Sequence, residues 1–111
     1  MQRKIVFIDD EVELCAIYKD LFTSEEFHIE CFSDIGPAKE YIESNDVTLC
    51  FIDYRMPEMN GPEFRELLPD GLSCVLLTGE LMDNDLEKFV EVIKKPFPYS
   101  EFTNIVEKLV G

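Results

Sequence analysis

Five short apolar runs alternate with amphipathic segments along this chain of 111 residues. The runs have the length and the β-branched and aromatic content of strands. They are Lys4–Ile8, His28–Phe32, Leu49–Ile52, Ser73–Leu77 and Val92–Ile93. The second run alternates polar and apolar positions and the fifth is brief, so we expect these two at the edges of a sheet. The other three are almost continuously apolar, as in strands buried on both faces.

The segments between the runs carry apolar residues at helical spacing, which predicts helices packed on the sheet. The first and last segments have five-point stripes, namely Leu14, Ile17, Tyr18, Leu21, Phe22 and Phe102, Ile105, Val106, Leu109, Val110. The middle segments have shorter stripes, namely Ala38, Tyr41, Ile42, then Phe64, Leu67, Leu68, then Leu86, Phe89, Val90. The turn Asn60-Gly61-Pro62 places proline at a helix start.

Strand and helix therefore alternate five times, which predicts an α/β fold with a doubly wound five-stranded parallel sheet and helices on both faces. With the three apolar strands in the centre, the strand order is 2-1-3-4-5, the flavodoxin-like order. We interpret residues 1–111 as one domain without an output domain. In this order the topological switch point lies between the first and third strands, and such folds bind their ligands there.

The strand ends carry the polar residues. Asp9 and Asp10 end the first strand, Asp53 the third, Thr78 the fourth and Lys95 the fifth. Alone, Asp53 would be interpreted as a cap of the loop that follows it. Together the three carboxylates would repel by around 4 kcal/mol per pair at about 4 Å, so they need a cation. Oxygen ligands favour magnesium over zinc, and a hydroxyl and an ammonium can hold an anion, which indicates a phosphoryl site on Asp53.

These residues also match a known pattern, and the chain resembles the response-regulator receiver domain over essentially its whole length. The matching motifs are the acidic pair Asp9-Asp10, the phosphoacceptor motif Asp53-Tyr54-Arg55-Met56-Pro57, the turn Asn60-Gly61, the pair Thr78-Gly79 and the motif Lys95-Pro96-Phe97. Five motifs in order, each at a strand end, make the resemblance specific.

The resemblance implies a phosphoacceptor of two-component signalling that assists its own phosphorylation and dephosphorylation and is not an enzyme. Asp53 would attack the phosphohistidine of a histidine kinase or histidine phosphotransferase, and Thr78 and Lys95 would bind the transferred oxygens. The Mg2+ ligands would be Asp10, Asp53 and the backbone carbonyl of Arg55, with Asp9 acting through water. The output would be changed binding to a downstream protein that the sequence does not identify.

The chain departs from the family pattern in two ways. The segments from Asp53 to Thr78 and from Thr78 to Lys95 are shorter than usual in the family, so we expect the third and fourth helices to be shortened. Three residues before Lys95 the family usually has an aromatic switch, whereas this chain has Val92. Valine is stiff and has no ring to turn, so we expect Val92 to pack within its strand. We therefore expect any response to phosphorylation to pass through the Thr78–Asp85 loop and the short helix with Leu86 and Phe89.

Composition narrows the function further. A net charge of −14 argues against nucleic-acid binding, which needs a basic surface. The chain has no apolar run of membrane-spanning length and no signal peptide, so we expect a cytoplasmic protein without a membrane partner. The four cysteines, which show no CxxC spacing, are Cys15, Cys31, Cys50 and Cys74. We expect buried free thiols rather than zinc ligands or disulfides.

Three other functions remain as alternatives. A receiver-like scaffold would bind a partner without phosphorylation, and it would be expected to lack an acid, the threonine or the lysine. A flavin-binding electron carrier would need a Ser/Thr/Gly-rich loop after the first strand, where Asp9-Asp10-Glu11 stands. An aspartyl phosphohydrolase usually has a second acid two residues after its nucleophile, where this chain has Arg55.

Overall fold

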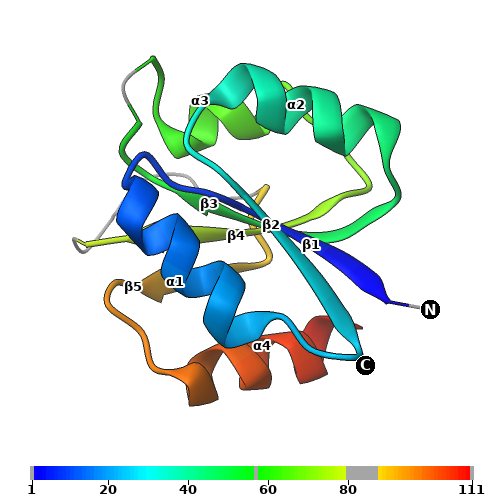
Figure 1. Ribbon diagram of the computed structural model, residues 1–111. Coiled ribbons are helices and arrows are strands. Elements are labelled where there is room, and N and C mark those ends of the chain that lie inside the picture. The colour runs from blue at the N-terminus through cyan, green and yellow to red at the C-terminus, as the bar shows by residue number, and fades with distance from the viewer. Residues whose placement is uncertain (1, 57, 80–87, 111) are drawn as a thin grey trace.

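A single parallel sheet organises the computed structural model, which describes residues 2–56, 58–79 and 88–110. Its strand order is β2-β1-β3-β4-β5, as predicted. The strands are β1 (Arg3–Ile8), β2 (Phe27–Phe32), β3 (Val47–Asp53), β4 (Ser73–Thr78) and β5 (Glu91–Lys94). The apolar runs thus form the centre of the sheet, and the alternating and brief runs form its edges (Figure 1).

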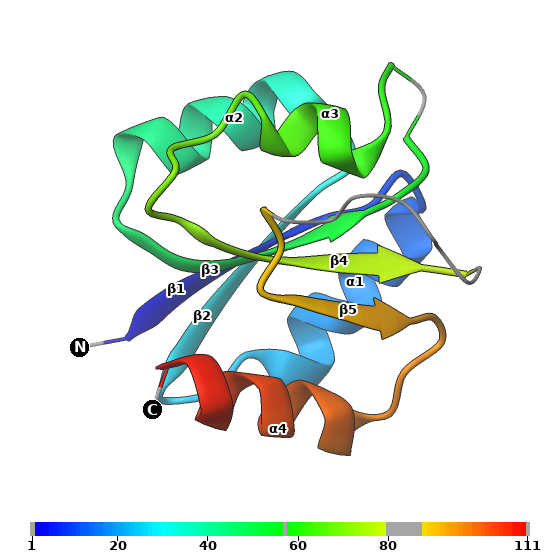
Figure 2. The same cartoon turned by 180° about the vertical axis from the view of Figure 1, so that it is seen from behind.

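Helices cover both faces of the sheet. Within the described residues they are α1 (Val12–Phe22), α2 (Ile35–Ser44), α3 (Gly61–Arg65) and α4 (Tyr99–Val110). Figures 1 and 2 show α1 and α4 on one face and α2 and α3 on the other, so the doubly wound arrangement is confirmed. None of the helices in the described ranges is long and apolar enough to cross a membrane.

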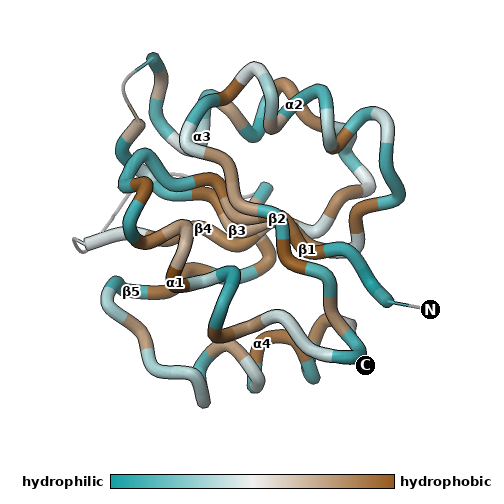
Figure 3. The backbone as a smooth tube through the Cα atoms, viewed as in Figure 1, coloured by the Kyte–Doolittle hydropathy of each residue, from teal (hydrophilic) through white to brown (hydrophobic). Residues whose placement is uncertain are grey.

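Because successive side chains of the central strands point to opposite faces of the sheet, these strands contribute to two apolar cores. In β1, Ile5 and Phe7 point to the α1 and α4 side, whereas Val6 and Ile8 point to the α2 and α3 side. All four side chains are fully buried. The tube in Figure 3 is correspondingly brown along the middle strands. Both faces of β1 are needed for the core, which fixes the position of the residues that follow it.

Stacked aromatic rings join α1 and α4 to the sheet. Phe7 lies 4.5 Å from Phe51 and 4.6 Å from Tyr18 between ring centroids, and Phe22 lies 3.9 Å from Phe102. Such pairs each contribute about 0.5–1.5 kcal/mol beyond the burial of their area. This cluster holds α1 against the sheet and against α4.

The predicted stripe of α1 is only partly correct. The helix buries Cys15, Tyr18 and Phe22 against the sheet, but Ile17 is 48% exposed and Leu21 is 56% exposed. The apolar stripe is wider than the row of residues that meets the sheet. Its outer residues therefore line a cleft beside the helix instead of entering the core.

The prediction of four free thiols is wrong for one pair. Cys15 of α1 and Cys31 of β2 form a disulfide, with Cα atoms 5.3 Å apart. Helix α1 packs beside the edge strand β2, and this brings together two cysteines that are 16 residues apart in sequence. Cys50 and Cys74 are buried free thiols, as predicted. They face each other on β3 and β4, and burial raises the pKa of Cys50.

The chain between β3 and β4 is compact, as expected, but its details differ from the prediction. Helix α3 has only five residues, so Leu67 lies beyond it and is 46% exposed. Arg65 is only 3% exposed, although charged side chains ordinarily lie at the surface. Its guanidinium donates to the backbone carbonyls of Leu68, Pro69, Asp70, Leu72 and Lys88.

Two further predictions concern the stretch before Lys95. Leu86 and most of the Thr78–Asp85 loop lie outside the described residues. Phe89 and Val90, which were predicted to share a short helix with Leu86, are described and are not helical. Val92 is 41% exposed, so the prediction that it packs within its strand is wrong. Its neighbour Ile93 points to the α4 side and is buried, which leaves Val92 on the other face of an edge strand.

Candidate functional site

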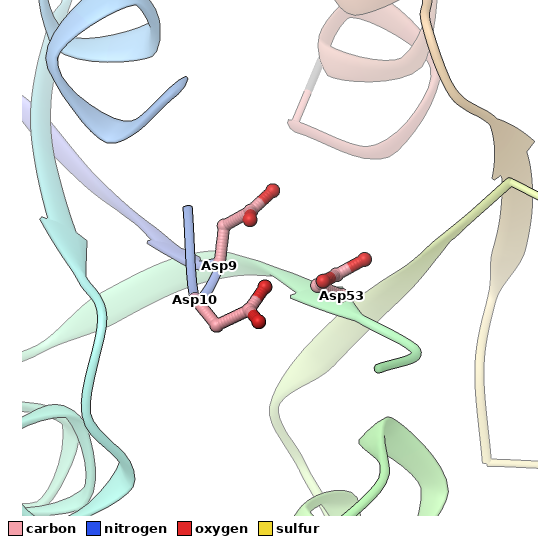
Figure 4. Close-up of side chains that lie close together, drawn as sticks. All are labelled: Asp9, Asp10 and Asp53. Carbon is pink, nitrogen blue, oxygen red and sulfur yellow. The ribbon is translucent and has the colours of Figure 1, made fainter. Parts of the chain in front are cut away.

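Three carboxylates converge at the carboxyl end of the sheet. Asp9 and Asp10 directly follow β1, and Asp53 is the last residue of β3, which pairs with β1. Each contributes an oxygen to a group whose atoms all lie within 4.8 Å of one another (Figure 4). Asp9 is fully buried and Asp53 is 6% exposed, whereas Asp10 is exposed. The predicted acidic cluster is therefore present.

The Lys95 ammonium lies between two of these carboxylates. Its Nζ donates to Asp9 Oδ2 at 2.9 Å and to Asp53 Oδ1 at 3.2 Å. The sequence analysis predicted that the fifth strand ends at Lys95, but β5 ends one residue earlier, at Lys94. The backbone N–H of Lys95 donates to the Thr78 carbonyl at 2.7 Å. The Lys95–Pro96 peptide bond is cis. The end of β4 thus fixes the backbone from which the lysine reaches the acids.

The charges in this cluster shift one another's protonation. Burial raises the pKa of Asp53 to about 6; repulsion by Asp9 adds to this rise and attraction by Lys95 opposes it. Burial alone would lower the pKa of Lys95, but its hydrogen bond to Asp9 and the attraction of both acids raise it above the ordinary value. Lys95 therefore stays charged, while the site disfavours the Asp53 carboxylate in the absence of further positive charge.

An open cleft of about 610 Å³ gives access to the site. Five of the six predicted site residues line this cleft, namely Asp10, Asp53, Arg55, Thr78 and Lys95. Its other walls are mainly apolar and come from α1, the segment after β5 and the start of α4: Leu14, Ile17, Tyr18, Leu21, Phe97 and Tyr99. Asp9 lies behind the cleft lining and reaches the site through Lys95.

The loop after Asp53 is held by close backbone packing. The Tyr54 N–H donates to the Leu77 carbonyl, and the Gly61 N–H donates to the Tyr54 carbonyl, both at 2.8 Å. Asn60 caps α3 through a reciprocal pair of hydrogen bonds with Glu63. A Cβ on Gly61 would lie 2.8 Å from the Asp53 carbonyl oxygen, so only glycine fits there. The Asn60-Gly61 turn thus positions the backbone of Asp53.

Two contacts of Asp9 were not predicted. The Glu11 backbone N–H donates to Asp9 Oδ1 at 3.0 Å, and the Tyr18 hydroxyl lies 3.5 Å from Asp9 Oδ2. Tyr18 belongs to the apolar stripe of α1, where an aromatic residue is ordinarily part of the core. Sequence spacing carries no sign that its hydroxyl reaches an acid nine positions earlier.

This geometry agrees with the comparison to known families. A sequence model described as the response regulator receiver domain matches residues 5–107. The chain belongs to the response regulator receiver family. Such receivers are components of two-component systems. The strand order and the acidic cluster are those that the apolar runs and the strand ends predicted.

Named relatives lie at moderate distance within this family. The response regulator receiver protein CpdR of Brucella abortus is 25% identical and covers 97% of each chain. The regulatory protein VanRc of Enterococcus gallinarum is 33% identical over 87% of this chain, which spans 45% of that protein. The solved structure of response regulator protein TrrA of Thermotoga maritima, in complex with Mg2+-BeF, is 25% identical, has a TM-score of 0.83, and covers 97% of this chain and 99% of that one.

Proposed function

We propose that this receiver takes a phosphoryl group onto Asp53 from the phosphohistidine of a histidine kinase or histidine phosphotransferase. The observation that carries the proposal is the position of Asp53 in the lining of an open cleft, beside Asp9, Asp10 and Lys95. Thr78 belongs to the same lining. The site combines a nucleophilic oxygen with groups that can neutralise a phosphoryl anion.

The three acids are not equivalent as nucleophiles. Asp9 is fully buried, and its two oxygens accept from the Glu11 backbone and from Lys95. Asp10 is exposed and its carboxylate is not held in a fixed direction by any hydrogen bond among the described residues. Asp53 is held through Oδ1 by Lys95, and within the described residues no hydrogen bond engages Oδ2. Asp53 is the acid that is both oriented and accessible.

The donor set fits Mg2+. All three side chains offer oxygen, and the charge of Asp9 adds to the rise in the pKa of Asp53 that burial causes. The residues that would hold the ion are Asp10, Asp53 and the Arg55 carbonyl, with Asp9 acting through water. When bound, Mg2+ supplies positive charge that offsets both the carboxylates and the incoming phosphoryl oxygens. The Mg2+-BeF complex of TrrA supports this assignment by analogy.

The protein residues act by positioning and by charge. In the transfer an Asp53 oxygen forms a bond to phosphorus as the bond from phosphorus to the donor imidazole nitrogen breaks, and the electron pair leaves with the imidazole. Lys95 offers its charged donors and Thr78 its hydroxyl to the transferred oxygens. The chain thus acts as a phosphoacceptor that assists its own phosphorylation and dephosphorylation. Its output is changed binding to a downstream protein.

Intact-mass spectrometry after incubation with acetyl phosphate tests the proposal. Wild-type protein with magnesium should gain one phosphoryl group, whereas chelator or the substitution Asp53→Asn should abolish the gain. Asp10→Asn should retain Asp53 but slow the reaction, because it removes a ligand and not the nucleophile. An unchanged wild-type mass would overturn the proposal and favour a receiver-like scaffold that binds its partner without phosphorylation.

A further inference from the structure

Tyr18 places a hydroxyl group behind the phosphoacceptor site. The residue lies in the middle of α1, is only 6% exposed, and forms part of the cleft wall that also contains Asp53 and Lys95. Its ring is confined by Phe7 at 4.6 Å and by Phe97 at 5.8 Å between centroids. The confined ring directs the hydroxyl to a point 3.5 Å from Asp9 Oδ2.

The same Asp9 oxygen accepts from Lys95 at 2.9 Å. Asp9 Oδ2 is therefore shared by a strong charged donor and a more distant neutral one, while Oδ1 accepts from the Glu11 N–H. An O–H···O hydrogen bond is usually about 2.5–3.0 Å long, so the tyrosine contact is long while Lys95 is in place. Catalytic contacts that are long in an unliganded site often shorten when the site is occupied.

Phosphorylation of Asp53 would change the hydrogen bonds that Lys95 makes. Lys95 now divides its donors between Asp9 and Asp53 Oδ1. A phosphoryl group on Asp53 adds anionic oxygens that attract the ammonium, because charge-assisted bonds to phosphate are strong. Asp9 is fully buried, so bulk solvent has little access to the oxygen that loses this donor. A buried acceptor left without a partner is costly.

We propose that Tyr18 is a positioning residue whose hydroxyl holds Asp9 Oδ2 when Lys95 turns to the phosphoryl oxygens. This inference rests on the proposed function of Asp53. The proposed role requires the hydroxyl group of Tyr18 when Asp53 is phosphorylated. Packing alone does not require it, because a phenylalanine ring would occupy the same place in the cleft wall. Burial raises the pKa of Tyr18, and the Asp9 charge adds to the rise, so the hydroxyl keeps its proton.

The substitution Tyr18→Phe separates the hydroxyl from the ring. Tyr99→Phe is the matched control: Tyr99 lines the same cleft, is 52% exposed, and makes no hydrogen bond to an acid among the described residues. The primary measurement is isothermal titration calorimetry of magnesium-saturated protein with beryllofluoride, a mimic of the phosphoryl group. The second is the melting temperature in chelator, which reports the packing of the empty site.

Tyr18→Phe should bind beryllofluoride about tenfold more weakly than wild type, as expected for loss of a hydrogen bond to a charged group. Its melting temperature in chelator should match that of Tyr99→Phe, whose affinity should be that of wild type. In an Asp9→Asn background the effect of Tyr18→Phe should shrink, because the charged acceptor is gone.

Equal affinity of Tyr18→Phe and wild type would overturn the role of Tyr18 while leaving the phosphoacceptor function intact. A loss of melting temperature in chelator with unchanged affinity would also overturn it, since this pattern indicates packing alone. Failure of the wild-type protein to bind beryllofluoride would instead contradict the proposed function, and the inference with it.

Discussion

Replacement of Asp53 by asparagine should stabilise the fold and remove the phosphoacceptor. The carboxyl group is 6% exposed, and burial together with Asp9 raises its pKa from 3.8 to about 6, despite the opposing attraction of Lys95. A carboxyl with a raised pKa keeps its proton better in the folded state than in the unfolded state. Its contribution to stability is thus fully present below about pH 4 and is lost as pH rises through about 6.

The magnitude follows from the two pKa values. A shift from 3.8 to about 6 corresponds to about 3 kcal/mol of lost stability once both states are ionised. Linkage gives a loss of about 1.6 kcal/mol at pH 5 and about 3 kcal/mol at pH 7.5. Asparagine has nearly the same shape and does not ionise, so Asp53→Asn should recover these amounts. The advantage of the variant should grow by about 1.4 kcal/mol between the two pH values.

Urea denaturation followed by circular dichroism in chelator measures this difference. The pH of these experiments should stay above the sequence pI of about 4.2, because the low net charge near the pI promotes precipitation. Added magnesium should narrow the gap at pH 7.5, because it stabilises the wild-type site by linkage. A gap of the same size at pH 5 and pH 7.5 would refute the claim that the folded site disfavours the Asp53 charge. A wild type that is more stable than the variant would refute it as well.

Three further predictions concern other parts of the molecule. Gly61→Ala should lower the free energy of unfolding by about 1–3 kcal/mol and slow phosphorylation, because its Cβ meets the Asp53 carbonyl; wild-type values in urea denaturation and mass spectrometry would contradict this. Arg65→Lys should lose about 2–4 kcal/mol in the same denaturation assay, because an ammonium cannot reach five backbone carbonyls at once. Thiol titration of the denatured, unreduced protein should find two reactive thiols, and four after reduction, since Cys15 and Cys31 are joined; four thiols without reduction would show that the disulfide is absent.

The sheet and the main site residues could be predicted because their signals are local. A strand buried on both faces must be apolar throughout, which distinguished the central strands from the edges and so fixed the strand order. Because the strands are parallel, polar residues directly after them lie together at the carboxyl ends of the strands. Asp9, Asp53 and Thr78 are therefore predicted to lie close together, and the structure brings them to one end of the sheet.

The features that escaped prediction depend on contacts between distant segments. The stripe of α1 did not reveal which residues meet the sheet and which line the cleft, so Ile17 and the hydroxyl of Tyr18 were misjudged. The disulfide needs α1 to lie beside β2, which no cysteine spacing encodes. Arg65 is buried because its guanidinium satisfies carbonyls of a loop that follows it, and a charged residue in a pattern is ordinarily assigned to the surface.

Localisation of the phosphoryl group on the chain tests the central claim most directly. Protein treated with acetyl phosphate and magnesium should be reduced with borohydride, which converts an aspartyl phosphate to homoserine, and then digested and sequenced by tandem mass spectrometry. The account predicts conversion at Asp53 alone, dependent on magnesium and absent without phosphodonor. Conversion at Asp9 or Asp10, or no conversion in a protein that binds magnesium, would contradict it.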